Sequence, residues 1–584
     1  MQPHPLARPQ PWEGAALSTR HSALSTQHSA LGIRRSLVPR PLRREGVAIF
    51  GLVAVPGLVL SYLLAFVLNI YSGDALSRTY QAMAVFYNEP ARLANMSFIW
   101  TPLPSFVQLP LVLIPALALN GYAGQIVSVF AAAGSLVLLN ALLRRLPLTR
   151  AWRYVLLVLY QLNPMVFIFT VNGMTESLMI FWVLYGALAL YDFGTHPQRV
   201  NFRAISLMGV AAGMAFLTRY EGVSYGAALA AVVVLFSVPR DPQDTPRLEA
   251  RLLAVSAPWV YAMFFWVLMN GLMMGDPLYF MTGRGSNREQ AAALLVTNAR
   301  LAALLLDPIA TLRYVALVLA HLYPAFFIVC GLLLLRAWRA ADKLALALAL
   351  VTLSFPAFQA LLHYAGQSFG WMRFHIYVIP LTVFSAAYLA TRNDAVGAEE
   401  EPVPWNLAPD RAQPAPAAVA PAPGVTPALL ALAILLVASS VVTGLSLSAP
   451  DIETAEENTY ARALTGGQAP DQFASEREMG VYLRALLARE PGARILLDDL
   501  HADYVVVFAG PSRGLVGTRD PQFRVHLSNP AGTVQYVLAS DILDGSDQVA
   551  TRVASVADAG EPFALVHRVD GSSGRVWSLY RVSP

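Results

Sequence analysis

Twelve long apolar runs, separated by short polar loops, dominate this chain of 584 residues. The runs lie near residues 47–70, 104–119, 122–143, 152–170, 174–191, 204–218, 222–238, 253–273, 313–336, 343–362, 371–391 and 427–448. An α-helix needs about 20 apolar residues to cross a bilayer, and most of the runs approach that length. Only 13% of the residues are charged, against about 25% in a soluble protein. The sequence therefore predicts an all-α polytopic membrane domain.

Composition divides the chain into five segments. Residues 1–45 are polar and basic and contain the tandem repeat ALSTRHS and ALSTQHS at 16–29, so we expect them to be disordered. Residues 46–391 hold the membrane domain, 392–426 form a linker rich in proline and alanine, and 427–449 form the last membrane helix. Residues 450–584 are predicted to fold as a small soluble α/β domain with its own core.

The loops between the apolar runs fall into two alternating sets. The set at 144–153, 196–203, 240–251 and 336–343 is basic, and the positive-inside rule places it in the cytoplasm. The set at 172–176, 218–222, 275–280 and 363–373 then faces outside, as does the soluble domain. Four prolines between 102 and 115 favour a re-entrant or in-plane segment there. We therefore expect eleven crossings of the cytoplasmic membrane, with the N-terminus inside and twelve crossings as the alternative.

Two acidic residues stand beside apolar runs on the expected outer side. Asp74 lies at the exit of the first run, before a helix predicted over 75–87 that would lie on the outer surface. Glu176 lies at the head of the run that begins near 174. Charges at this depth usually line a functional cavity. The alternatives are that Asp74 caps its helix and that Glu176 only compensates a helix dipole.

Two further outer turns carry charge. Arg219 and Glu221 lie between two apolar helices, and a spacing of two positions does not put them on one helix face. We therefore expect a non-helical turn whose two side chains point into a cavity or simply pair with each other. Asp276 lies in the sequence Gly-Asp-Pro, which is a strong turn signal by itself. The stretch at 284–306 is amphipathic and could lie in the membrane interface.

The last outer loop offers His363 and Arg373. Arginine suits bidentate recognition of a phosphate, and anchoring at the membrane interface is the alternative role.

No P-loop, Rossmann fingerprint, HExxH motif or nucleophile elbow occurs, and the single Cys330 excludes an intrachain disulfide. The outer acidic residues and arginines therefore favour a reaction on a phosphate-linked lipid, in which arginines neutralise the phosphate and a carboxylate acts as base.

At these residues the sequence resembles the GT-C class of glycosyltransferases, which includes protein O-mannosyltransferases and lipid A aminoarabinose transferases. The resemblance covers roughly 47–391 and rests on Asp74, the NP…MTES run at 163–177, TRYEG at 218–222, NG…GDPLYF at 270–280 and GQS…R at 366–373. It implies a polyprenyl-phosphate-linked sugar as donor, transfer to an acceptor glycan, lipid or protein outside the membrane, and catalysis by Asp74 as base or metal ligand. This chain has a lone aspartate where many members carry two adjacent acidic residues or D-x-D.

We expect Asp74 to deprotonate or orient an acceptor hydroxyl that attacks the anomeric carbon of the donor. Two arginines stabilise the leaving phosphate, and two glutamates shape the cavity and could hold a divalent cation, Mg or Mn. The expected substrate-binding residues are Arg219, Arg373, Glu176, Glu221, Asp276 and His363. No nucleic acid partner is expected.

The soluble domain is predicted to contain a helix over 475–489 and strands at 495–497, 504–508, 534–538, 563–568 and 576–582. Its acidic pair Asp498-Asp499 is expected on a loop, and the domain is expected to bind the acceptor or act as a lid. Two other functions fit the same features. A transporter or flippase for a lipid or small solute would also use buried charges and broken helices. A non-enzymatic membrane scaffold would use the soluble domain for interaction.

Overall fold

The computed structural model of the protein describes residues 40–195, 202–238, 245–391, 425–449, 454–543, 546–557, 563–571 and 575–583. The first helix, α2 (Arg40–Leu63), begins inside the segment that we expected to be disordered. The tandem repeat at 16–29 and nearly all of the expected linker lie outside the described residues.

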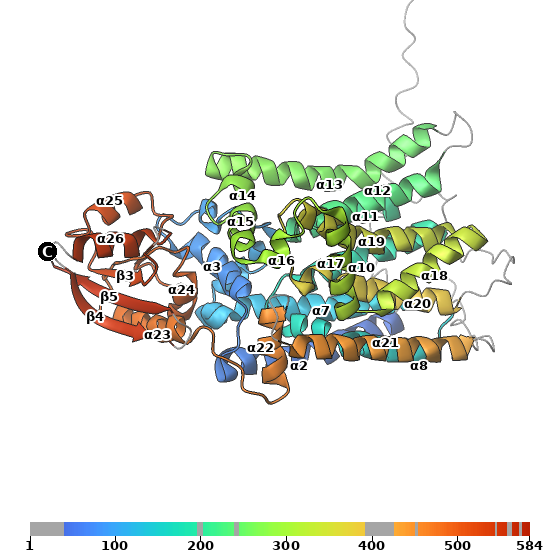
Figure 1. Cartoon of the computed structure of the whole chain (residues 1–584), viewed down its shortest axis with the longest axis horizontal. Helices are drawn as coiled ribbons and strands as arrows, with labels where there is room; N and C mark the ends of the chain where they lie inside the picture. Colours follow the sequence, from blue (N-terminus) through green and yellow to red (C-terminus); the bar gives the residue numbers. More distant parts are fainter. Residues whose placement is uncertain are drawn as a thin grey trace, which may run out of the picture. The chain divides into compact units, whose positions relative to one another are not determined.

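Long apolar helices make up most of the described chain, which is therefore a multi-pass membrane protein (Figure 1). Seven described stretches are long and apolar enough to span a bilayer: Arg44–Leu68, Pro115–Leu143, Glu176–Thr195, Thr245–Met274, Lys343–Tyr364, Met372–Thr391 and Thr426–Ser448. Two bent helix pairs and the shorter helices α11 (Phe202–Thr218) and α12 (Gly222–Ser237) add to them. The predicted all-α polytopic domain is confirmed, and the number of crossings stays a prediction.

Two apolar runs that read as continuous spans are broken. The first becomes α8 (Arg150–Gln161) and α9 (Pro164–Val171), bent by 70°. Asn163 causes this break because its side chain accepts hydrogen bonds from the N–H groups of Met165 and Val166, at 3.1 and 3.3 Å. The second run becomes α17 (Pro308–Leu322) and α18 (Ala325–Ala340), bent by 110° where Pro324 interrupts the helix.

The proline-rich segment after the first outer loop forms no continuous helix. It consists of α4 (Leu103–Phe106), α5 (Leu109–Val112), α6 (Pro115–Ala118) and the 3₁₀ turn η4 (Leu119–Gly121). The long helix α7 (Tyr122–Leu143) follows. The break into short helices agrees with a segment that is not one straight span, and its predicted re-entrant or in-plane position stays a prediction.

Helix α11 packs closely against α13 (Thr245–Met274), which runs beside it in Figure 1. Small residues make this approach feasible, since a Cβ on Gly209 would stand only 2.4 Å from the carbonyl oxygen of Val255. A Cβ on Gly213 would stand 2.9 Å from that of Pro258. The pair Gly209 and Gly213 therefore forms a GxxxG contact of the kind common between membrane helices.

Helix α3 (Gly73–Tyr87) confirms the predicted helix after the first span, but its predicted place on the surface is wrong. Every residue from Ala75 to Val85 is buried, because α4, α7 and α24 (Asp503–Ala509) pack around it. The chain then continues through the 3₁₀ turn η3 (Leu93–Met96). The first outer loop is thus an interior element of the protein.

The outer loop after α13 contains three short helices. These are α14 (Tyr279–Thr282), α15 (Asn287–Thr297) and α16 (Ala299–Ala302). Helix α19 (Lys343–Tyr364) leads to the last outer loop, which ends in the 3₁₀ turn η6 (Met372–His375) and α20 (Val378–Thr391). The last long apolar helix is α21 (Val425–Ser448).

The C-terminal residues fold around a five-stranded mixed sheet of order β2-β1-β3-β5-β4. Its strands are β1 (Ile495–Leu496), β2 (Leu515–Val516), β3 (Tyr536–Ser540), β4 (Phe563–Asp570) and β5 (Val576–Val582). Strand β1 pairs in parallel with β2 and β3, and β5 lies antiparallel between β3 and β4. The helices are α22 (Ala455–Leu464), α23 (Ala474–Arg489), α24, α25 (Phe523–Ser528) and α26 (Gln548–Ala557).

Alternate residues of the central strands face two different layers of helix. Ile495 and Leu538 face α23 and α24, whereas Leu496 and Val537 face α25 and α26. The predicted α/β fold is confirmed, but the predicted strand at 504–508 is wrong. That run is the helix α24, because it is buried between the sheet and α3.

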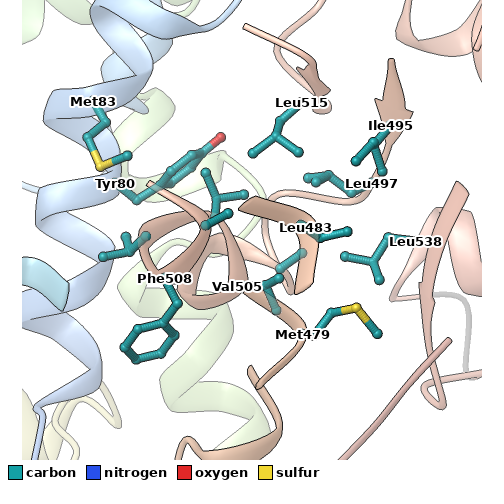
Figure 2. Packing of buried hydrophobic residues seen from close by; sticks show 14 of the residues in the cluster. Tyr80, Met83, Met479, Leu483, Ile495, Leu497, Val505, Phe508, Leu515 and Leu538 are labelled. Atoms are coloured by element: carbon teal, nitrogen blue, oxygen red, sulfur yellow. The ribbon is translucent and has the colours of Figure 1, made fainter. Parts of the chain in front are cut away.

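The core under α24 is shared with the membrane domain. Tyr80 and Met83 of α3 belong to the same buried cluster as Phe508 and Leu515 (Figure 2). The C-terminal domain therefore does not have a self-contained core on this face. The contact between the C-terminal domain and α3 belongs to one continuous hydrophobic cluster.

Candidate active site

A cavity of about 300 Å³ lies where the outer loops meet. Its polar lining consists of Asp74, Arg78, Thr101, Thr175, Arg219, Glu221, Asn287, Arg288, Gln290, Gln359 and Gln367. Its apolar lining is largely aromatic and comprises Trp100, Met174, Tyr220, Val223, Phe280, Met281, Phe358, Leu362, Phe369, Trp371 and Phe374. Apolar walls around a few convergent charges are typical of a ligand site.

Asp74 and Arg373 form an ion pair at this cavity. Nη2 of Arg373 donates to Oδ2 of Asp74 over 2.9 Å. The arginine side chain is only 2% exposed, whereas that of the aspartate is 34% exposed. Asp74 lies in the first turn of α3 with Ser72 at the N-cap, so the capping role considered for Asp74 is wrong. The buried arginine orients a carboxylate that keeps one face toward the cavity.

Glu176 joins this pair to a second arginine. Its Oε1 accepts a hydrogen bond from Nη1 of Arg219 at 2.8 Å and lies 3.8 Å from Nε of Arg373. Arg219 also bonds Glu221 across the expected non-helical turn, with Nη2 and Oε1 3.0 Å apart. Five residues from four separate loops or turns therefore meet in one chain of ion pairs: Asp74, Arg373, Glu176, Arg219 and Glu221.

The loop before η6 places Arg373 in this network. Gly370 has φ of 76°, which only glycine adopts without strain, and its carbonyl accepts a hydrogen bond from the Tyr314 hydroxyl at 3.0 Å. Ser368 donates to Gln359, whose amide lies 3.5 Å from Glu221. Ser368 of the GQS motif thus supports, through Gln359, the Glu221 carboxylate that Arg219 also binds.

Arg78 is a site residue that the sequence reading missed. It lies one helical turn after Asp74 on α3, lines the same cavity and is only 8% exposed. Its Nη1 donates to the carbonyl of Thr101 at 3.3 Å, and its guanidinium stacks 4.9 Å from the centre of the Trp100 ring. Burial, aided by the like charge of Arg219, lowers the pKa of Arg78 to about 10, so it stays a cation at neutral pH.

No carboxylate among the described residues lies within ion-pair distance of Arg78. The signal that could have found it is its spacing of four positions from Asp74 on a predicted helix. A buried cation without a carboxylate partner, facing a cavity, is suited to an anionic ligand.

Of the six predicted substrate-binding residues, Arg219 and Glu221 line the cavity, whereas Glu176, Arg373, Asp276 and His363 do not. Asp276 lies in the turn after α13, where it accepts hydrogen bonds from Leu278 N–H at 2.9 Å and Thr282 Oγ1 at 2.6 Å. These bonds lower the pKa of the Asp276 carboxyl. His363 is buried at the end of α19 with its ring edge-on to Tyr314. Asp276 therefore has the turn role that was its alternative, and His363 packs behind the cavity wall.

The amphipathic stretch 284–306 contributes to the cavity through α15, which brings Asn287, Arg288 and Gln290 to its edge. Just before this helix, Arg284 reaches Asp498 of the C-terminal domain, with Nη1 and Oδ2 3.3 Å apart. The cavity therefore has one wall that is tied to the C-terminal domain.

Acidic residues of the C-terminal domain hold it on α3. Tyr80 donates its hydroxyl proton to Asp499 at 2.5 Å, and Ser77 donates to Asp503. Burial raises the pKa of Asp503 to about 7 and also raises that of Asp498. Asp498 and Asp499 lie on a loop as predicted, and their contacts are structural.

One more carboxylate reaches the site from α22. Oε2 of Glu456 accepts a hydrogen bond from Nη1 of Arg373 at 2.8 Å. No sequence motif marks Glu456, which lies 83 positions from its partner.

The two glutamates that were considered as ligands for a divalent cation do not fit that role. Glu176 and Glu221 flank the guanidinium of Arg219. Within the described ranges, no group of three or more His, Cys, Asp or Glu side chains is arranged to hold a metal ion.

Neither the models of known protein families nor the curated proteins contain a match to this sequence. Among solved structures, ArnT from Cupriavidus metallidurans bound to undecaprenyl phosphate matches with a TM-score of 0.52 at 13% identity, over 91% of this chain and 97% of ArnT. ArnT in the apo state matches with a TM-score of 0.51 at 14% identity, over 92% and 98%. The archaeal oligosaccharyltransferase AglB from Archaeoglobus fulgidus gives 0.41 at 9% identity, over 92% and 74%, which is too low to establish a shared fold.

The likeness to ArnT confirms the fold that the resemblance noted in the sequence implied. At this identity it establishes the fold of the chain and no more.

Proposed function

We propose that this protein is a membrane glycosyltransferase that moves a sugar from a polyprenyl-phosphate-linked donor to an acceptor. One observation carries the proposal. Asp74 and Arg78, one turn apart on α3, face the same cavity, where Asp74 is held by Arg373 and Arg78 has no carboxylate within ion-pair distance. A base and a free cation side by side are what the transfer of a phosphate-linked group requires.

In the proposed reaction the donor phosphate binds Arg78 at the cavity, with Arg288 at the rim. The acceptor hydroxyl attacks the anomeric carbon, a new C–O bond forms, and the bond from that carbon to the phosphate oxygen breaks. The electron pair leaves with the phosphate, whose added negative charge Arg78 stabilises. The hydroxyl proton passes to Asp74, whose carboxylate Arg373 holds in place through their ion pair.

The roles of the other residues follow from their contacts. Arg219 and Arg373, first expected to hold the phosphate, are already paired with carboxylates. In this proposal they shape the site and support the charge of the phosphate from a distance. Glu176 and Glu221 fix the two arginines. The aromatic wall excludes water from the reacting atoms.

The ligand of ArnT, undecaprenyl phosphate, supports a lipid phosphate as the leaving group. The apolar lining of the cavity, with Phe280, Phe358 and Leu362, suits the adjoining polyprenyl chain. The sugar and the acceptor are to be identified by assay.

The direct test uses the full-length chain reconstituted in liposomes with a panel of polyprenyl-phosphate sugars and a membrane extract as acceptor source. We expect release of free polyprenyl phosphate from at least one donor, together with labelled acceptor. Movement of intact donor across the bilayer without its cleavage would instead support the transporter alternative.

Arg78→Ala tests the phosphate site. We expect kcat/KM for the donor to fall about 100-fold, with partial recovery in Arg78→Lys. The matched control is Arg524→Ala, which removes an exposed arginine on α25. Equal activity of Arg78→Ala and the control would contradict the role of Arg78.

We also propose that the cavity and the C-terminal domain lie on the extracytoplasmic face of the cytoplasmic membrane. The loop between α7 and α8 contains Arg144, Arg145 and Arg150. The positive-inside rule supports a cytoplasmic position for this loop, at the other end of the membrane helices from the cavity. The single native cysteine, Cys330, is buried, so introduced cysteines can be labelled selectively. A membrane-impermeant maleimide should label Glu478→Cys on α23 in intact cells and leave Arg150→Cys unlabelled until lysis. The reverse pattern would invert the topology.

A further inference from the structure

The helix after the last span brings a carboxylate to the back of the site. Glu456 lies in the first turn of α22, close beyond the end of α21. Its Oε2 is 2.8 Å from Nη1 of Arg373, while Oδ2 of Asp74 is 2.9 Å from Nη2 of the same guanidinium. One buried arginine therefore binds two carboxylates through its two terminal nitrogens.

The two contacts restrict the arginine more than either would alone. Guanidinium is planar and its donors are fixed relative to one another, so a bond at Nη1 determines where Nη2 points. Nε lies 3.8 Å from Glu176, beyond hydrogen-bond distance, and has no hydrogen-bond partner in the described part of the chain. Glu456 thus supplies the second fixed point that aims Arg373 at Asp74.

We propose that Glu456 is a positioning residue for Asp74: by binding the far side of the Arg373 guanidinium it sets both how the aspartate is oriented and how much of the arginine's charge it receives. This inference rests on the proposed function. If Glu456 has this role, then α22 at the start of the C-terminal domain is part of the active site, because it contacts Arg373 of the membrane domain.

The electrostatic direction of the effect follows from the sign of the charges. An ionised Glu456 competes with Asp74 for Arg373 and also repels it as a like charge, so Asp74 is a stronger base than it would be with Arg373 to itself. Burial raises the pKa of Glu456, and the charge of Asp74 adds to that rise against the opposing effect of Arg373. Among the described residues, other charged or titratable groups that interact with this site are Glu176 of α10, Glu457 and Tyr460 of α22, Tyr504 of α24, Arg78 of α3, and Tyr377, which precedes α20.

The test compares Glu456→Gln with wild type in the reconstituted full-length protein. The substitution keeps the shape and removes the charge, so Asp74 should become a weaker base. We expect kcat to fall roughly three- to tenfold, donor KM to change little, and the acid limb of the kcat profile to move to lower pH. Glu456→Asp should partly restore the wild-type profile. Glu478→Gln, an exposed change on α23, is the matched control.

A second readout does not depend on activity. Carbodiimide couples an amine to protonated carboxyl groups, and mass spectrometry reports the extent at the partly exposed Asp74. In Glu456→Gln the pH dependence of coupling at Asp74 should differ from that of wild type, in the direction of lower pH. A lower unfolding temperature with unchanged pH profile and unchanged Asp74 reactivity would show that Glu456 only anchors α22, which would overturn the proposal.

The two proposals fail in different ways. If Asp74→Asn abolishes transfer while Glu456→Gln matches wild type at every pH, the positioning role is wrong and the transferase function stands. If Asp74→Asn leaves transfer intact, the proposed function is wrong.

Discussion

Arg373 and Asp74 lie 299 positions apart in the sequence and form an ion pair of 2.9 Å at the edge of the cavity. The arginine is buried and the aspartate is partly exposed. The arginine therefore holds the carboxylate of Asp74 in place while one side of that carboxylate stays open to a ligand. The rest of the site is arranged around this contact, with Glu176 and Arg219 on one side and Glu456 on the other.

Substituting Arg373 tests this arrangement. Arg373→Lys keeps the charge but offers a compact ammonium that does not reproduce the two fixed directions of the guanidinium. We expect at least a tenfold loss of kcat with normal insertion. Arg373→Ala should also lower the free energy of unfolding by about 1–3 kcal/mol, because Asp74 and Glu456 lose the guanidinium that binds them both. Transfer assays and thermal unfolding in detergent measure the two effects, and wild-type rates in Arg373→Lys would contradict the account.

Gly73→Ala tests the contact between α3 and the C-terminal domain. A Cβ on Gly73 would stand 2.7 Å from the Tyr504 hydroxyl oxygen and 3.3 Å from Cζ of the same ring. We expect Gly73→Ala to displace the neighbouring Asp74 and lower kcat roughly tenfold. Tyr504→Phe removes the nearest atom, so the double variant should recover most of the activity. If kcat of the double variant stayed as low as that of Gly73→Ala, the clash with Tyr504 would not be the cause of the loss.

Asp503 should make stability depend on pH. Burial raises the pKa of this carboxyl from 3.8 to about 7. Between these values the folded chain holds a proton that the unfolded chain has lost, so stability falls as pH rises through the window. Asp503→Asn should therefore unfold at a higher temperature than wild type at pH 8 and at a similar temperature near pH 4. Asp541→Asn, an exposed change, should show no such difference, and equal pH dependence in all three proteins would reject the effect.

Gly209→Ala tests the packing of α11 on α13. The added Cβ would stand 2.4 Å from the carbonyl oxygen of Val255. A backbone atom shifts less easily than the end of a flexible side chain to relieve such a clash. We expect a loss of about 1–3 kcal/mol in the free energy of unfolding. Gly331→Ala on α18 is the control, since a Cβ there has no heavy atom within 4 Å. Thermal unfolding of both variants compares them, and equal stability would show that the helices separate at little cost.

Much of the fold and part of the site can be predicted from the sequence because a bilayer imposes simple rules. A charge such as Asp74 or Glu176 at the end of an apolar run is expensive unless it has a role. The turn with Arg219 and Glu221 could be predicted as non-helical from their spacing. The meeting of these loops with Arg373 depends on tertiary packing, which spacing does not encode.

The missed features have physical reasons. Helix α24 contains Val505, Val506 and Val507, which favour strands, and packing against α3 overrides that preference. Glu456 lies in an acidic stretch that reads as a solvated helix start. Its importance arises only because α22 meets Arg373.

The central claim is that Asp74 is the base of a glycosyl transfer from a lipid phosphate. The most direct measurement is the release of polyprenyl phosphate by Asp74→Asn, beside wild type and the control Asp276→Asn, in reconstituted full-length protein. The account predicts a loss of 100-fold or more in Asp74→Asn, with normal insertion and an unchanged rate in Asp276→Asn. Wild-type release by Asp74→Asn would contradict it.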